Sequence, residues 1–308
     1  MTLIQPPMMV HGGTHPARAF RMMVRDLARG SQGVTEGNDL KVRPTATPGA
    51  AVRVGDGSAI VRGATFGQGC YTQYNIGDAA VQVAPTAGTG RTDLLVLRVE
   101  DPEYEGSRNP AVDQIGYFQV IPNVSATATT PPQGMTAIPL ARITLPPNCQ
   151  TVTDAMITDL RSIANPRRSR RIFTGFPKSD DNYTAGQNTP WPLASQWRIW
   201  IPDWATQTRI ILQLNAVQVI GNGVWALQGF QFGALTGETV VIDSAMDYSQ
   251  RINVVSADTL NIPADHRDTV QTLRSLITRS PGDGGQGLLQ ADVATTIVAD
   301  VEFEEGVY

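Results

Sequence analysis

The chain has 308 residues, of which 41% are hydrophobic and 17% are charged, and its formal net charge at pH 7 is −4. An acidic chain has no bulk attraction for nucleic acid or for an anionic membrane surface, so we expect neither as its main partner. No run of about 18 apolar residues occurs, and the first residues lack the basic start and apolar stretch of a signal peptide. These features predict neither membrane insertion nor export. The 29 glycines and 21 prolines favour many short elements over long helices.

Cysteine usage excludes a disulfide framework. The only two cysteines, Cys70 and Cys149, lie far apart in the sequence, and two lone thiols form neither a disulfide-rich scaffold nor a zinc knuckle. We expect both to be reduced, buried small side chains in a protein assembled in a reducing cytoplasm.

The N-terminal region predicts an arm followed by one helix. Residues 1–15 are polar and interrupted by Pro and Gly, so we expect an arm that lies along a neighbouring subunit or is mobile. Residues 16–29 follow a helical pattern, with Thr14 as a candidate N-cap and Gly30 as the stop. The apolar positions recur at helical spacing: Phe20, Met23, Val24 and Leu27. A helix of four turns is too short to be stable alone, so this apolar stripe must pack against something.

Residues 39–160 alternate with a period of two, which predicts a β-rich domain spanning residues 16–164. The expected strands are Ala51–Val54, Ser58–Arg62, Tyr71–Asn75, Ala80–Val83, Thr92–Val99, Gly116–Ile121 and Ile138–Leu145, with a short helical turn near Thr153–Leu160. The first two flank Gly55 to Gly57, which indicates a tight hairpin. Thr92–Val99 is apolar on both faces, so we expect it at the centre of its sheet.

A basic, apolar-free segment, Asn165–Arg171, marks the expected boundary. We predict a linker over residues 165–180 that is solvated or pairs with an acidic surface of a partner, with contact to nucleic acid or a protease as the alternative.

Residues 181–308 predict a second all-β domain. The expected strands are Gln196–Ile201, Arg209–Ile220, Val224–Phe232, Thr239–Ile242, Arg251–Ala257, Thr269–Ile277 and Asp292–Phe303. Strands and turns at this spacing favour a jelly-roll-like β-sandwich. The fold class is therefore mostly β: an N-terminal β-rich domain with one short helix, followed by the sandwich.

Four phrases occur in order in the first half: Ala51–Gly63, Thr92–Gly106, Ile138–Pro146 and Ile157–Arg161. Their order and wording resemble the N-terminal domain of tailed-bacteriophage minor tail proteins, the baseplate or tail-tip components, especially those of phages of actinobacteria. Leu260–Thr272 resembles segments of the β-sandwich domains that end many phage tail proteins.

The resemblance implies a structural virion protein of the phage tail, assembled in the host cytoplasm. It further implies an N-terminal domain that docks into the baseplate, other tail proteins as partners, and a homotrimer. Some members of the family carry a terminal domain for receptor recognition, so binding of a host cell-surface glycan by the sandwich is the alternative.

Candidate chemistry is sparse. His11 and His15 are four apart, but Gly12 and Gly13 break the helix that a two-histidine metal site needs. The acidic residues of DPEYEG could bind Ca²⁺, act as acid and base in glycoside cleavage, or form a structural turn: Asp101, Glu103 and Glu105. We favour the turn and expect no catalytic residues, no cofactor, no metal and no enzymatic activity; a polysaccharide-degrading enzyme is the third class considered.

All five tryptophans lie in the second domain: Trp191, Trp197, Trp200, Trp204 and Trp225. Exposed Trp rings stack on sugars or anchor protein interfaces. In the expected strand 196–201, Trp197 and Trp200 point to opposite faces, so they cannot both be core. We name Trp191, Trp200 and Trp204 as the candidate glycan or partner contacts, with burial as the alternative for most tryptophans.

Overall fold

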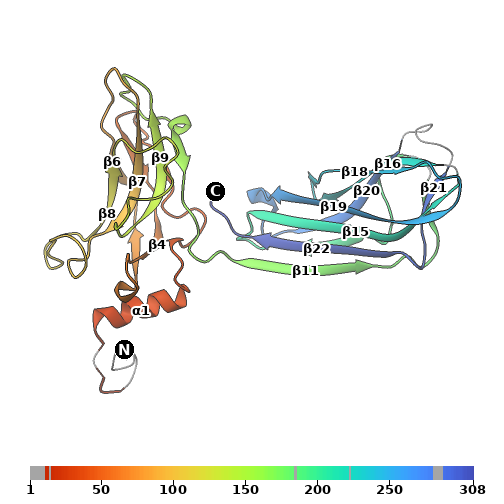
Figure 1. Ribbon diagram of the computed structural model, residues 1–308, viewed down its shortest axis with the longest axis horizontal. Helices are drawn as coiled ribbons and strands as arrows, with labels where there is room; N and C mark the ends of the chain where they lie inside the picture. Colours follow the sequence, from red (N-terminus) through yellow and green to blue (C-terminus); the bar gives the residue numbers. More distant parts are fainter. Residues whose placement is uncertain (1–10, 14, 184–185, 222, 280–286) are drawn as a thin grey trace. The chain divides into compact units, whose positions relative to one another are not determined.

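The computed structural model describes residues 11–13, 15–183, 186–221, 223–279 and 287–308. The chain divides into two compact units. The N-terminal unit comprises Met1–Pro166 together with Val307–Tyr308, and the C-terminal unit comprises Arg167–Gly306. The fold is mostly β in both units, as the sequence predicts, with one α-helix in the described residues (Figure 1). In the described residues, no helix is both long enough and apolar enough to cross a membrane.

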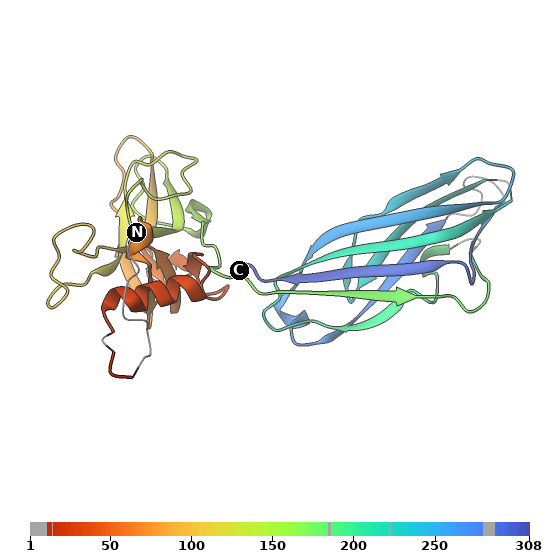
Figure 2. The same ribbon diagram turned by 60° about the horizontal axis from the view of Figure 1, so that its bottom comes forward.

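The N-terminal unit consists of three small antiparallel sheets and the helix. Its elements are α1 (Ala17–Leu27), β1 (Gly33–Val34), β2 (Val42–Pro44), β3 (Ala51–Val54), β4 (Gly57–Arg62), the 3-10 helix η1 (Phe66–Gln68), β5 (Cys70–Asn75), β6 (Ala79–Gln82), β7 (Arg91–Val99), β8 (Gly116–Ile121), β9 (Ala137–Leu145), η2 (Asp154–Met156) and β10 (Ile157–Asp159). The strand orders are β1-β4-β5, β2-β3-β6 and β10-β9-β7-β8. In both ribbon views, α1 (red) lies at one end of these strands (Figure 2).

Strand β7 is central, as its sequence predicts, because β9 and β8 pair with its two edges. Leu95, Leu97 and Val99 on one face belong to the main core of the unit. Leu94 and Val96 on the other face belong to a much smaller apolar cluster. The second face of this sheet is therefore covered by loops and not by another sheet.

The expected hairpin at Gly55–Gly57 is wrong. Strand β3 pairs with β2 and β6, whereas β4 pairs with β1 and β5, so the chain passes from one sheet to another. Gly57 has a φ of +142°, and a Cβ there would lie 2.5 Å from the Cα of Asp39. Only glycine allows this close backbone packing. At this position the chain therefore continues from β3 into a different sheet and does not reverse direction to form a hairpin.

The C-terminal unit is a sandwich of two antiparallel sheets. Its elements are β11 (Arg168–Gly175), β12 (Asp181–Tyr183), β13 (Gly186–Pro190), β14 (Gln196–Trp200), β15 (Gln207–Ile220), β16 (Val224–Phe232), β17 (Leu235–Thr236), β18 (Val240–Ser244), β19 (Gln250–Asn261), η3 (Ala264–His266), β20 (Val270–Arg279), β21 (Leu288–Ala291) and β22 (Thr296–Glu304). One sheet has the order β11-β22-β15-β21-β12 with β19 on β15, and the other has β13-β20-β16-β17 with β14 on β20 and β18 on β16. Buried side chains of both sheets, such as Leu212 and Phe230, form one core.

Within β15 the alternation of buried and exposed side chains changes at a β-bulge. Ile210, Leu212 and Leu214 are buried, but the register shifts between Leu214 and Val217. Ala216 has a φ of +60° and donates its backbone N–H to Asn253 Oδ1. The extra residue places Val217, and not Ala216, in the core.

Half of the expected linker over residues 165–180 is a strand. Residues 168–175 form β11, which pairs with β22 along its whole length at the edge of the sheet (Figure 2). The predicted basic segment finds its acidic partners inside the chain: Arg168 pairs with Glu304 and Arg170 with Asp300. Opposite charges across neighbouring strands favour this register. The boundary between the units accordingly lies at 166/167.

Candidate docking surface and the other candidate sites

Helix α1 contacts the rest of its unit through arginines. Arg21 donates from Nη2 to Glu103 Oε2 at 2.6 Å and from Nε to the carbonyl oxygen of Gln68 at 2.9 Å. Its Nη1 lies 3.4 Å from Asp101 Oδ2. Beneath the helix, Gly69 leaves no room for a side chain, because a Cβ there would lie 2.7 Å from the backbone carbon of Arg21. Sterics and charge together therefore hold this face of α1 against η1 and β5.

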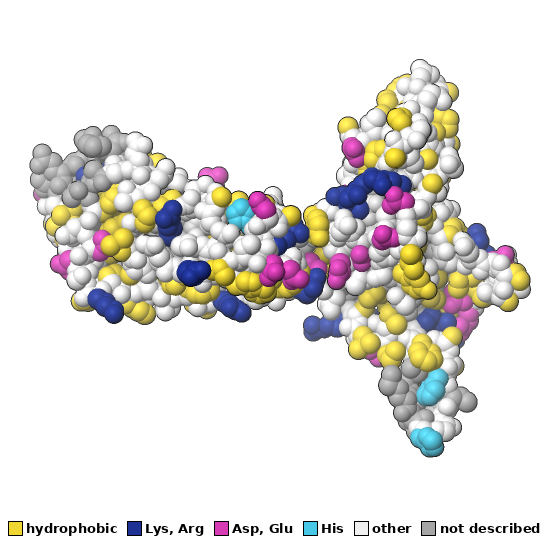
Figure 3. All heavy atoms as spheres, turned by 180° about the vertical axis from the view of Figure 1, so that it is seen from behind, with side chains coloured by type: hydrophobic (Ala, Val, Ile, Leu, Met, Phe, Trp, Pro, Cys, Tyr) yellow, Lys and Arg dark blue, Asp and Glu magenta, His cyan; other side chains and the backbone are white. Residues whose placement is uncertain are grey.

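Two residues of the apolar stripe of α1, Phe20 and Leu27, are exposed, whereas Met23 and Val24 are half-buried. Phe20 is 47% exposed and Leu27 is 73% exposed, and no residue of α1 is fully buried. The space-filling view shows that hydrophobic side chains occur on the surface among polar and charged ones (Figure 3). The helix does pack against something, as its length requires, but its polar contacts to the unit come from Arg21 and not from the predicted apolar stripe.

The ends of α1 agree in part with the sequence pattern. Thr14, the candidate N-cap, lies outside the described residues, and Pro16 precedes the helix without a side-chain cap. Gly30 has a φ of +72° and donates its N–H to the carbonyl oxygen of Arg25, so the predicted stop is confirmed.

The acidic turn after β7 holds the helix. Asp101 accepts a hydrogen bond from the Tyr71 hydroxyl at 2.6 Å, Glu103 accepts from Arg18 and Arg21, and Glu105 lies 3.3 Å from Arg98 Nη2. Hydrogen bonds from Arg18 and Arg21 lower the pKa of Glu103, so its carboxylate is charged at neutral pH. Burial, with the hydrogen bond to Asp101, raises the pKa of Tyr71. The three carboxylates are thus engaged in protein contacts, as a structural turn requires.

The remaining metal candidates are not brought together. His15 packs edge-on against Phe20, with ring centroids 6.4 Å apart, and His266 Nδ1 lies 3.1 Å from Asp265 Oδ1. In the part of the chain that the structure describes, no group of three or more His, Cys, Asp or Glu side chains is placed to hold a metal ion. Cys70 and Cys149 are buried free thiols, as expected.

The prediction that Trp191 contacts a glycan or a partner is wrong. Trp191 is 2% exposed in the sandwich core, where its Nε1 donates to the carbonyl oxygen of Asp181 at 3.0 Å. It also packs against Tyr183, with ring centroids 6.0 Å apart. The sequence pattern did not show whether Trp191 is buried or exposed, because the residue lies between two short strands without a clear alternation of apolar and polar residues. A ring enclosed in this way cannot stack on a sugar or a partner.

Trp200 and Trp204 differ in exposure. Trp200 is 45% exposed on the outer face of β14, and its Nε1 lies 3.3 Å from Asp268 Oδ1. Trp197, three residues earlier, packs against the core, so the predicted division between the two faces is confirmed. Trp204 is half-buried against the core, with the Arg167 guanidinium 5.6 Å from its ring centroid. Of the three candidate contacts, only Trp200 is exposed on the outer face of a strand.

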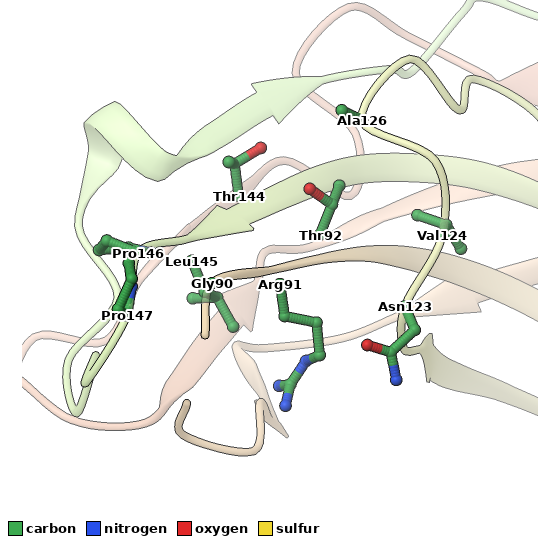
Figure 4. A pocket seen from close by; sticks show the side chains of 10 residues that line it. All are labelled: Gly90, Arg91, Thr92, Asn123, Val124, Ala126, Thr144, Leu145, Pro146 and Pro147. Atoms are coloured by element: carbon green, nitrogen blue, oxygen red, sulfur yellow. The ribbon is translucent and has the colours of Figure 1, made fainter. Parts of the chain in front are cut away.

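A shallow pocket of about 600 Å³ opens on the N-terminal unit at the ends of β7 and β9 (Figure 4). Its lining is Gly90, Arg91, Thr92, Asn123, Val124, Ala126, Thr144, Leu145, Pro146 and Pro147. The guanidinium of Arg91 is held by the buried carboxylate of Asp93, with 2.7 Å between Nε and Oδ1. The lining contains no carboxylate, imidazole or thiol that could act as a general acid, base or nucleophile. The pocket offers no catalytic arrangement.

Comparisons with known proteins give distant likenesses only. No family model matches the chain, and no curated protein matches it. Among solved structures, the chain is similar to the VP2 subviral particle of infectious bursal disease virus, with 11% identity, a TM-score of 0.29, and coverage of 91% of this chain and 73% of that chain. The chain is also similar to the structure of the infectious bursal disease virus Gx strain, with 11% identity, a TM-score of 0.26, and coverage of 91% of this chain and 72% of that chain. BuGH86 in complex with neoagarooctaose gives 9% identity and a TM-score of 0.21, over 86% of this chain and 34% of that chain. Scores this low assign no role to the chain.

Proposed function

We propose that the chain is a structural virion protein of a bacteriophage tail tip or baseplate, which assembles with other tail proteins as a homotrimer and has no enzymatic activity. The observation that carries this proposal is the orientation of α1. A helix that is attached by Arg21 and displays Phe20 and Leu27 to solvent is a preformed docking element, because exposed apolar side chains gain free energy when a partner covers them.

The ordered phrases of the N-terminal unit support the same function. The second phrase, Thr92–Gly106, covers all but the first residue of the central strand β7, together with the acidic turn that binds α1 through Glu103. This segment thus provides the central strand of the sheet and the turn that positions α1, the helix on which Phe20 and Leu27 are exposed. The carboxylates of this turn contact Arg and Tyr side chains of the chain, which supports a structural role for them.

Light scattering on the purified chain tests the homotrimer. At micromolar concentration the expected mass is about three times 33.1 kDa. Replacing Phe20 and Leu27 by Ser should reduce the mass to that of a monomer without changing the circular dichroism spectrum. The matched control is Ile76→Ser, which removes another highly exposed apolar side chain far from α1 in the sequence and should leave the trimer intact. A monodisperse wild-type monomer contradicts the trimer.

Mass spectrometry of purified phage particles tests the virion assignment. Tryptic peptides of this chain should be found in intact particles at a copy number that is a multiple of three. Detection only in the lysate of infected cells, with none in purified particles, contradicts a structural role in the virion.

A second candidate function is host-surface binding by the C-terminal unit, and Trp200 favours it. An exposed indole ring beside a carboxylate is the combination that stacks on a sugar ring and hydrogen-bonds its hydroxyl groups. Calorimetric titration of the whole chain with bacterial cell-wall glycans should detect binding that Trp200→Ala abolishes and Phe176→Ala retains. Absence of binding, or equal binding by both variants, contradicts this role.

A further inference from the structure

A groove of about 850 Å³ lies on the N-terminal unit at the C-terminal end of α1. Its lining includes Arg25, residues 62–66 from the last residue of β4 onward, and the loop over residues 129–135. Arg25 is the residue of α1 in the groove lining, so the lining shares no side chain with the apolar stripe of that helix. Its lining belongs entirely to the N-terminal unit.

The floor of the groove is apolar. Met135, Ala137 and Leu160 line it, and all three belong to the small cluster on the second face of the sheet that contains β7. Met135 and Leu160 are only half-buried. This part of the sheet face therefore remains accessible to an apolar side chain of a ligand.

The rim of the groove is positive. Arg25 and Arg62 line it, whereas none of its lining residues is Asp or Glu. Seven other arginines of this unit form ion pairs with carboxylates in the described residues. Neither Arg25 nor Arg62 has such a partner in that part of the chain. In a chain of net charge −4, this is a local concentration of uncompensated positive charge.

Both guanidinium groups are held in place without a carboxylate. Arg25 lies over the ring of Phe66, 4.6 Å from its centroid, and Arg62 Nη1 donates to the carbonyl oxygen of Gly30 at 3.2 Å. Their position near the C-terminus of α1 also favours positive charge. These contacts leave further N–H groups of each guanidinium for a ligand, since each carries five donors.

We propose that this groove binds an acidic segment of a partner protein, with an apolar side chain on the floor and flanking carboxylates on Arg25 and Arg62. Charge complementarity favours carboxylates at the rim, and the apolar floor favours a peptide over a nucleic acid strand. Two cations are also few for a phosphate backbone, whose binding depends on many such contacts. The proposal goes beyond the trimer formed through α1, because it concerns a separate surface.

Fluorescence anisotropy with two pools of labelled octapeptides tests the proposal. The acidic pool carries Asp or Glu at four positions and Leu, Met, Phe or Val at two, and the basic pool carries Lys or Arg at the same four positions. We expect saturable binding of the acidic pool by the whole chain and none of the basic pool. Binding should weaken about tenfold between 50 and 300 mM salt, because the rim charges are solvent-accessible.

Charge-removing variants locate the binding. Arg25→Gln and Arg62→Gln should each weaken binding of the acidic pool about tenfold, the loss expected for one charge-assisted hydrogen bond. Arg62→Lys should retain most of the affinity. The matched control is Arg29→Gln, which removes the same charge from an exposed position outside the groove lining and should change the affinity less than about twofold. Thermal unfolding of each variant verifies that it is folded.

Three results overturn the proposal. They are no saturable binding of the acidic pool at millimolar concentration, an equal loss with Arg29→Gln, and tighter binding of a labelled ten-nucleotide oligothymidylate than of the acidic pool. Because light scattering reports the trimer separately, failure of the groove proposal and failure of the proposed assembly are distinguishable.

Discussion

Arg21 on α1 and Asp101 in the turn after β7 form an ion pair with 3.4 Å between Nη1 and Oδ2, and each side chain is only 12% exposed. The Tyr71 hydroxyl donates to the same oxygen of Asp101 at 2.6 Å. This enclosed cluster connects residues eighty positions apart in the sequence. It explains why an amphipathic helix packs with its charged face inward.

Replacing Arg21 by Ala should detach α1. The change leaves the carboxylates of Asp101 and Glu103 without their shared cation, and we expect the free energy of unfolding to fall by about 1–3 kcal/mol. Urea denaturation measures this loss. Arg18→Ala, which removes the more exposed partner of Glu103, is the control and should have a clearly smaller effect. Equal effects of the two variants contradict the central position of Arg21.

Adding one methyl group at Gly69 should also displace the helix. Gly69 and Gly77 share a φ of +78°, but a Cβ at Gly69 meets the backbone of Arg21, whereas one at Gly77 meets nothing within 4 Å. Gly77→Ala should cost about 1 kcal/mol through backbone strain alone. Gly69→Ala should cost at least about 1 kcal/mol more, because the overlap forces α1 to move. Thermal unfolding compares the two, and equal costs contradict the observed packing.

Stability should fall on acidification. Hydrogen bonds from Arg18 to Glu103 and from Arg170 to Asp300 lower the pKa of both carboxyl groups in the folded chain. The unfolded chain therefore binds more protons at low pH. The stability that these groups add is complete above their unfolded values of about 4, and it is lost as the pH falls through the lowered folded values.

The melting temperature measured from pH 7 to pH 2.5 tests this dependence. These two groups should change the melting temperature little between pH 7 and pH 5. At pH values below about 4, the melting temperature should decrease. Asp300→Asn should reduce the acid-dependent part of the fall. Asp247→Asn is the control, because Asp247 is exposed and has no ion pair in the described residues. An unchanged acid dependence in Asp300→Asn contradicts the assignment.

The tryptophans should separate into a core and a surface class. Trp191→Ala removes a buried indole and should lower the free energy of unfolding by about 3–5 kcal/mol. Trp200→Ala should lower it by less than about 1 kcal/mol, since the side chain is half exposed. Guanidinium denaturation followed by circular dichroism measures both, and a large loss for Trp200→Ala contradicts its surface position.

Local sequence pattern determined much of the secondary structure. The alternation of 92–99 predicted a central strand, and β7 is central because both its faces are apolar and are covered. The helical spacing of Phe20, Met23 and Leu27 predicted α1. These features depend on neighbouring residues, whose periodicity the backbone geometry sets.

Only the tertiary structure decided which face of each element is covered and what it contacts. The Arg21 side of α1 packs against the unit because Arg21 forms an ion pair with Asp101, which lies in a turn far away in the sequence. Arg170 lies in a strand and not in a linker, and its ion-pair partner Asp300 lies on the adjacent strand. Trp191 is core because Tyr183 and the backbone of Asp181 enclose it. Such outcomes depend on long-range pairing of charges and surfaces, and no local period of the sequence encodes that pairing.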